Sequence, residues 1–556
     1  MKLKKYIIIL FGVIITSCSL DEVWYDKVVP ETFFKSESDV LAALYRPFTH
    51  ARWYLTGDRW LAQELTGDQF ARTTKGRHWY DGGRYARYQH HEWTPDESQL
   101  FGTWRGTLQG VALALDVKAD LGKLDYSTVA LTEEDKTAHL AQLDALTAFF
   151  YLRGLDFFGG LPIFTSLDQD NVPRSSDKET FDHIEALLQK AINELPVREV
   201  GAPQEGAMTK GAAALMLARL YFNAEPYIGE AMYEEAAEIS EKILAGEYGE
   251  YSLDPEWNGP HDFFNHESPE IIWSIPSEFN RLEYTHYDHM YHYNSRVYFD
   301  IDLGSNNGTH LQPSRKPNGE PYSNDFRLGS PYEKFEDTDL RKRPYKYLGN
   351  GRYEGMFLVG NQVSPITGAQ VIGNEEYNGQ PVVFVDQVGR FSEIGRTYSS
   401  VNEVPSNINA GEENSGIRLV KIPIPSSADI SLRWGADHPA FRLAEVYLML
   451  AECRLRLGDA ARAATLINDV RRRAFEGGND PNPATAANLD LYRMADEWGI
   501  EFLGEGRRRT DLIRLGFFTT EAWWDHTPSN APHLNRFPVP TEALSASNVL
   551  EQNPGY

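Results

Sequence analysis

One stretch of this chain combines aromatic rings with polar side chains at close spacing. It runs from residue 68 to residue 85 and includes Arg72, Arg77, Trp79, Tyr80 and Asp81. A sugar packs its apolar C–H face on Trp or Tyr, and its hydroxyl groups bond to polar side chains. Gly82 and Gly83 follow these rings and indicate an exposed loop. We therefore predict that these residues bind a saccharide, with ordinary core packing as the alternative.

A second aromatic stretch covers residues 284–294 and offers the same chemistry through Tyr284, Tyr287 and Tyr291. The same stretch contains His286, His289 and His292. At this interval of three residues, they would share one face of a helix and could together bind a metal. No carboxylate or cysteine completes that set clearly. Asp300 and Asp302 resemble the start of a calcium loop, but Leu311 stands where a bidentate acid is expected. We therefore predict neither a metal nor another cofactor.

Catalytic signatures are weak in this sequence. A glycosidase needs two carboxylates about 5–10 Å apart, and among 80 acidic residues such a pair can always be imagined. The sequence contains no serine elbow or phosphate loop, and His91-Glu92 lacks the second histidine of a zinc-protease motif. We expect a protein that is not an enzyme, with an exported glycoside hydrolase and a structural helical adaptor as the alternatives.

The N-terminus carries a secretory signal that ends at Cys18. Lys2, Lys4 and Lys5 precede an apolar run over residues 6–15, and small polar residues then lead to the cysteine. The run is about half of the ~20 residues that a membrane-spanning helix needs. This order looks like a bacterial lipobox, so we predict cleavage after residue 17 and a lipid on Cys18. An ordinary secretory signal with an incidental cysteine is the alternative.

Charge and cysteine content restrict the partners of the mature chain. Removing three lysines with the signal leaves 51 basic and 80 acidic residues, a net charge of −29 over 539 residues. Such a chain is repelled by phosphate backbones, so we expect no nucleic-acid partner.

Cys453 is the only cysteine outside the signal, so this exported protein is expected to fold without disulfides. Within a helical pattern, Cys453 is expected to be a buried thiol.

Four pairs of helices are expected to position these residues. The predicted pairs span residues 39–54 with 104–121, 136–158 with 181–195, 209–221 with 233–245, and 443–451 with 460–470. Asp177 is the expected N-cap of the 181–195 helix, which Pro196 ends, while Gly458 and Asp459 form the turn of the last pair. Small residues on the contact faces of the last two pairs are tetratricopeptide-like.

The amino-acid composition changes between residues 248 and 435, where Gly, Pro, Asn and Tyr dominate and the hydrophobic periodicity of helices is lost. Residues 271–276 are predicted as a short strand containing a core Trp273, and residues 381–388 as a second candidate. Long irregular segments in compact proteins usually carry function. The expected divisions are therefore a signal peptide (1–17), a lipidated linker (18–38), N-terminal hairpins (39–247), a ligand-binding excursion (248–435) and a C-terminal hairpin with tail (436–556).

Several motifs, taken together and in order, resemble the SusD/RagB family of nutrient-binding outer-membrane lipoproteins of Bacteroidota. They are FGGLP at 158–162, TKGAA at 209–213, RLAEVYLM at 442–449, LGD at 457–459, VRRRA at 470–474, EFLGEGRRRTDL at 501–512 and NPGY at 553–556. The resemblance covers essentially the whole mature chain. Its motif residues are expected to be structural: Gly159 and Gly160 in a tight turn, and Glu445, Arg507 and Asp511 in internal charge pairs.

The resemblance implies an all-α scaffold of four tetratricopeptide-like helical hairpins with a large irregular, loop-rich insertion. It implies a cell-surface protein, lipid-anchored in the outer membrane, that captures a glycan and delivers it to a SusC-like TonB-dependent transporter. Asp21 and Glu22, just behind Cys18, are similar to the signal for export to the outer face of that membrane. A peptide or another nutrient is the alternative ligand, and the sequence does not identify the glycan.

Overall fold

The computed structural model describes residues 33–198, 206–281, 283, 288–374, 376–389 and 398–556. Cys18, the signal, Asp21, Glu22, Tyr284, His286 and Tyr287 lie outside these residues. Within the described ranges, no helix combines the length and the hydropathy that crossing a bilayer requires.

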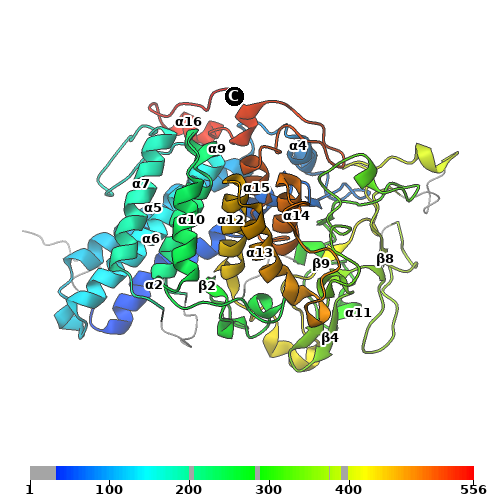
Figure 1. Cartoon of the computed structure of the whole chain (residues 1–556), viewed down its shortest axis with the longest axis horizontal. Coiled ribbons are helices and arrows are strands. Elements are labelled where there is room, and N and C mark those ends of the chain that lie inside the picture. The colour runs from blue at the N-terminus through cyan, green and yellow to red at the C-terminus, as the bar shows by residue number, and fades with distance from the viewer. Residues whose placement is uncertain (1–32, 199–205, 282, 284–287, 375, 390–397) are drawn as a thin grey trace, which may run out of the picture.

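Eight long helices form a continuous array (Figure 1). They are α2 (Glu37–Tyr54), α5 (Ser98–Lys123), α6 (Glu133–Phe158), α7 (Asp177–Glu194), α8 (Lys210–Phe222), α10 (Tyr233–Leu244), α12 (Leu443–Arg456) and α13 (Ala460–Arg471). Each helix packs against the next in this order. The four predicted helical pairs are therefore confirmed, and neighbouring pairs stack on one another.

Shorter helices complete the scaffold. They are α3 (Gly57–Glu64), α4 (Arg84–His90), α9 (Ala224–Ile228), α11 (Arg296–Phe299), α14 (Leu491–Glu501), α15 (Arg508–Arg514) and α16 (Thr541–Ala546). Helix α14 packs on both α12 and α15, and α15 packs on α3. The C-terminal segment thus returns to the first hairpin.

The segment between α10 and α12 leaves the helical array and returns to it through a two-stranded sheet. Strand β2 (Ile271–Ile275) pairs antiparallel with β10 (His438–Arg442), which leads directly into α12. The strand predicted at 271–276 is confirmed, and Trp273 within it is fully buried. Helices α10 and α12 consequently pack together although more than 190 residues separate their nearest ends.

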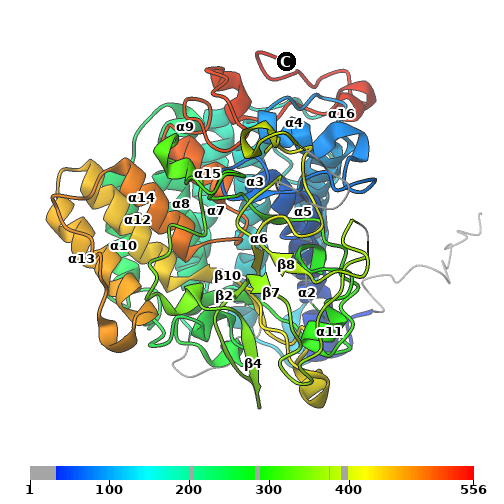
Figure 2. The ribbon, with the colours of Figure 1, turned by 90° about the vertical axis from the view of Figure 1, so that its right-hand side faces the viewer.

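Beyond that base, the excursion is held by very short strands, which Figure 2 shows in front of the helices. The pairs are β1 (Phe70–Ala71) with β3 (His310–Leu311), β4 (Lys346–Gly349) with β5 (Arg352–Glu354), β6 (Phe357–Leu358) with β9 (Arg418–Leu419), and β7 (Gly360–Asn361) with β8 (Val383–Phe384). The second candidate strand, at 381–388, is reduced to β8. The β1–β3 pair joins the N-terminal helical region to the excursion.

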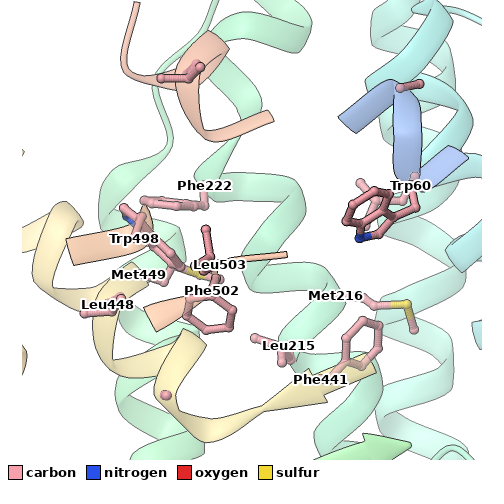
Figure 3. Packing of buried hydrophobic residues seen from close by; sticks show 14 of the residues in the cluster. Trp60, Leu215, Met216, Phe222, Phe441, Leu448, Met449, Trp498, Phe502 and Leu503 are labelled. Carbon is pink, nitrogen blue, oxygen red and sulfur yellow. The ribbon is translucent and has the colours of Figure 1, made fainter. Parts of the chain in front are cut away.

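Aromatic and aliphatic side chains from distant hairpins fill one large core (Figure 3). Trp498 of α14 lies 6.0 Å from Phe222 of α8 and 5.4 Å from Phe502, measured between ring centroids. Cys453 is fully buried, as expected, and its surroundings raise the pKa of the thiol well above the ordinary value because burial disfavours the thiolate.

Local signals explain where several helices begin and end. Ser176, rather than the predicted Asp177, is the N-cap of α7, and its side chain forms a capping box with Glu179. Asp177 instead accepts a hydrogen bond from the Gly160 amide at 2.6 Å. Asp459 caps α13 as predicted, by accepting from the Arg462 amide at 3.0 Å.

The charged residues of the C-terminal motifs are internal. Arg507 lies 3.0 Å from Glu445 and 2.9 Å from Asp511, which confirms the predicted charge pairs. Buried Arg442 reaches Glu501 at 2.6 Å and Glu505 at 2.7 Å. These pairs join β10 and α12 to the segment that contains α14 and α15.

Candidate functional site

Arg72 and Lys75 support the loop that carries the first aromatic stretch. The Arg72 guanidinium lies 4.8 Å from each of the Trp79 and Tyr85 rings and donates to Thr309 Oγ1 at 2.8 Å. Lys75 Nζ donates to the Gly308 carbonyl at 2.8 Å. Burial lowers the pKa of Lys75 well below its ordinary value, reinforced by nearby positive charge. Both side chains are almost fully buried.

This position corrects the prediction for Arg72. With 3% of its surface exposed, Arg72 holds the aromatic rings in place rather than facing a ligand. The sequence did not distinguish the two roles because an arginine beside aromatic residues fits either one.

Trp79 and Tyr80 sit on a strained backbone turn. Trp79 and Asp81 have φ of 67° and 43°, and Gly82 follows at 64°. Such angles cost non-glycine residues of the order of 1–3 kcal/mol, and they persist where the surroundings enforce them. Here the Trp79 indole donates to the Asn306 carbonyl at 3.2 Å and packs over Gly308, whose absent Cβ would lie 3.0 Å from the ring.

The turn presents Tyr80 to solvent. Its side chain is 60% exposed, whereas Trp79 is partly buried beside it. Asp81 and Gly82 are also exposed, which confirms the predicted exposed loop. A partly buried indole next to an exposed phenol supplies two apolar faces at the surface, and the contacts of Trp79 fix that of the indole.

The structure brings the two predicted aromatic stretches together. The His78 ring centroid lies 5.9 Å from that of Tyr293, and the Trp79 ring lies 6.5 Å from His289 in an edge arrangement. We call His78, Trp79, Tyr80, His289 and Tyr293 the aromatic cluster. Its two halves are more than 200 residues apart in sequence.

Polar side chains border the aromatic cluster. Arg77 is exposed and donates from Nε to His78 Nε2 at 3.3 Å. Arg84 lies 3.7 Å from Asp81 and 3.8 Å from Asp58, so one guanidinium contacts both carboxylates. Arg77 and Asp81 are therefore accessible at the surface beside Trp79 and Tyr80, and their role in ligand binding stays a prediction.

Tyr291 does not belong to this surface. It is fully buried, and its ring lies 5.1 Å from that of Phe299 in the excursion core. The expectation that Tyr291 faces a ligand is therefore corrected, because the chain turns inward between His289 and the partly exposed Tyr293.

The described histidines of the second stretch have separate partners. His289 Nδ1 lies 2.6 Å from the Asn306 amide nitrogen, whereas His292 Nε2 donates to the buried Glu413 carboxylate at 2.5 Å. A short 3₁₀ turn, Asp288–Met290, replaces the helix that would have put them on one face. Across the described residues, no group of three or more His, Cys, Asp or Glu side chains could hold a metal ion.

Asn306 and Gly308, which no sequence motif singles out, fix the position of Trp79 from within the excursion. No local signal could have found them, because their role depends on a contact across more than 220 residues. The fold and this site together define a helical-hairpin protein with a loop-built aromatic surface.

Comparison with known proteins identifies the family to which this helical-hairpin protein belongs. The model of the SusD family matches residues 269–556, which is more than half of the chain. The chain belongs to the SusD family.

Relatives and solved structures agree with this assignment. The starch-binding protein SusD of Bacteroides thetaiotaomicron is 26% identical over 449 residues, covering 77% of this chain and 75% of that protein. A SusD superfamily protein from Bacteroides fragilis has a similar structure, with a TM-score of 0.66 at 19% identity over 94% of this chain and all of that one. Surface glycan-binding protein A from Bacteroides thetaiotaomicron, solved with laminarihexaose, gives a TM-score of 0.60 at 18% identity, over 93% of this chain and 99% of that one.

Proposed function

We propose that this protein is a cell-surface glycan-binding lipoprotein that captures an oligosaccharide or polysaccharide without cleaving it. The observation that carries the proposal is the aromatic cluster, which two distant segments build and which leaves Tyr80 60% exposed. Sugars bind to such surfaces by stacking their C–H faces on the rings. Arg77 and Asp81 supply hydrogen-bonding groups at its border.

The relatives support a saccharide ligand. One is named a starch-binding protein, and another was solved with laminarihexaose. In this protein, the proposed ligand-binding part comprises the excursion, residues 248–435, together with the loop that contains Trp79 and Tyr80. The glycan would contact both segments at once.

The proposed location and partner complete this function. A lipid on Cys18 would hold the protein at the outer face of the outer membrane, and residues 18–38 would act as the linker to the folded body. A SusC-like TonB-dependent transporter would take the captured glycan for import. Membership of the SusD family supports this partner.

The carboxylates beside the aromatic cluster favour binding over hydrolysis. A glycosidase requires two carboxyl groups that flank the scissile bond and differ in protonation. Asp58 and Asp81 both contact the same guanidinium, that of Arg84, and both are substantially exposed. Because one guanidinium bridges them, these two carboxylates face each other across Arg84 rather than across an open position for a glycosidic bond.

The test is calorimetric titration of the mature, lipid-free protein with starch-type and laminarin-type oligosaccharides. Replacing Tyr80 with Ala removes the exposed ring, and we expect about tenfold weaker binding, or about 1.4 kcal/mol. Tyr80→Phe keeps the stacking face and should retain most of the affinity. Trp79→Ala should weaken binding further, because the neighbouring turn loses its anchor.

Phe264→Ala provides the matched control, since Phe264 is a comparably exposed aromatic residue outside the cluster, at 48%. Equal affinities of the wild type and Tyr80→Ala for a bound glycan would remove the site assignment. Binding of peptides but not of glycans would show that the ligand is a peptide. Release of shorter sugars by the pure protein would show that it is a glycoside hydrolase.

A further inference from the structure

A small recess lies in the helical scaffold. It forms where the end of α2 meets α6, α8, β10 and the segment leading into α15, and its volume is 80 Å³. Phe441 and Phe502, which belong to the core in Figure 3, line part of it. Because one water needs roughly 10–15 Å³ by this measure, the recess has room for a small group and its hydration but not for a saccharide.

The recess is lined by four arginines, Arg153, Arg219, Arg442 and Arg507, and by three carboxylates, Asp156, Glu445 and Glu505. His438 also lines it, and burial lowers the pKa of His438 to about 3, which keeps its imidazole neutral. The lining thus has an excess of one positive charge.

Each carboxylate of the lining already has cationic or hydrogen-bonding partners. Asp156 accepts from Gln63 Nε2 at 2.7 Å, from the Tyr227 hydroxyl at 3.0 Å and from Thr510 Oγ1 at 2.9 Å. Arg509 Nη1 lies a further 3.5 Å from the same carboxylate.

The two glutamates are paired in the same way. Glu445 is bound by Arg219 and, at 3.0 Å, by Arg507. Glu505 is bound by Arg442 at 2.7 Å and by Lys421 at 2.9 Å. Three of the four arginines therefore have carboxylate partners.

Arg153 is the exception. Among the described residues it forms neither a hydrogen bond nor an ion pair, and its Nε atom is buried without a partner. Its guanidinium carbon lies 6.0 Å from the Tyr54 ring centroid and 5.9 Å from that of Phe157, so aromatic rings flank it, and the charge of Asp156 acts on it without a direct ion pair. Burial lowers the pKa of Arg153, in keeping with a poorly compensated cation.

We propose that this recess binds a small inorganic anion of the size of chloride, held by the guanidinium of Arg153. The anion would neutralise the one arginine of the lining that has no directly bonded carboxylate, and the N–H groups of Arg153 would donate to it. Since α6, α8 and β10 all border the recess, a bound anion would join hairpins from both halves of the helical array. Binding to the folded state alone would raise its stability with anion concentration.

The experiment is thermal unfolding of the mature, lipid-free protein at constant ionic strength while chloride replaces gluconate, an anion too large for the recess. We expect the unfolding temperature to rise with each tenfold increase in chloride. Arg153→Gln should lose this chloride-dependent shift. Arg46→Gln should keep it, because Arg46 is an exposed arginine that carries the same charge elsewhere.

Crystals of the wild-type protein grown in bromide give a second readout that does not depend on the variant folding. An anomalous bromide peak in the recess beside Arg153 supports the proposal. Water alone at Arg153, or an unfolding temperature that responds equally to chloride and gluconate, overturns it.

Discussion

At the residue scale, the candidate site depends on buried polar groups that fix the partly buried Trp79 beside the exposed Tyr80. Arg72 stacks against Trp79 and bonds to Thr309, and Trp79 in turn bonds to the Asn306 carbonyl. Rings held in this way lose little further freedom when a ligand binds, which lowers the entropic cost of recognition. The φ of Trp79, 67°, is one that costs a non-glycine residue free energy and persists because the surroundings enforce it.

Elsewhere, two buried histidines make stability depend on pH. The rings of His91 and His526 lie 4.2 Å apart, and they donate to the carbonyls of Thr66 at 2.8 Å and Gln89 at 2.7 Å. Burial lowers the pKa of His526 to about 4, from an ordinary value near 6.5. Between pH 4 and pH 6.5, His526 is protonated in the unfolded state but not in the folded state. The free energy of unfolding therefore keeps its full contribution from His526 above pH 6.5 and loses it as the pH falls towards 4.

We therefore predict that the free energy of unfolding decreases between pH 7 and pH 5, with about 2 kcal/mol of the loss due to His526. Urea denaturation at the two pH values measures it. His526→Phe should reduce the decrease by about that amount, whereas His266→Gln, at an exposed histidine, should not. An unchanged pH dependence in His526→Phe would show that this imidazole does not titrate with unfolding.

At the scale of elements, the turn between α6 and α7 illustrates how glycine permits close backbone approach. Gly159 has φ of 76°, and a Cβ on Gly160 would lie 2.0 Å from the Ser175 carbonyl oxygen. The Ser176 capping box then starts α7 directly beside this contact. The turn therefore fixes the relative position of two consecutive hairpin helices.

Gly160→Ala should destabilise the protein by about 2–3 kcal/mol, because the clash is with backbone rather than with a flexible side chain. Gly102→Ala is the matched control: Gly102 lies in α5 with nothing within 4 Å of its absent Cβ, so alanine should stabilise by up to about 1 kcal/mol. Chemical denaturation compares the two. Equal effects of the two substitutions would contradict the packing at the turn.

The helical elements could be predicted from the sequence because their periodicity is local. The four hairpins, the Asp459 cap and the β2 strand follow from nearby residues. The burial of Arg72 and Tyr291 could not be predicted, because arginine and tyrosine are equally suited to a surface or to a packed interior. The contact of Trp79 with Asn306 depends on a chain path of more than 220 residues, which no local pattern specifies.

At the scale of the whole molecule, a helical array supports a loop-rich excursion, and buried ion pairs hold the base of that excursion. Arg442, at the end of β10, pairs with Glu270 beside β2 at 3.1 Å and with Glu501 of α14 at 2.6 Å. Buried pairs of this kind are costly to break, because each partner left alone is an uncompensated charge. These buried ion pairs therefore fix the base of the excursion on the helical array.

The decisive measurement for glycan capture by the aromatic cluster is the position of a bound oligosaccharide in a crystal of the mature protein. We expect a sugar ring stacked on the aromatic cluster, in contact with Tyr80 and with Arg77 or Asp81. A saccharide bound only elsewhere on the molecule, with the aromatic cluster unoccupied at saturating ligand, would contradict it.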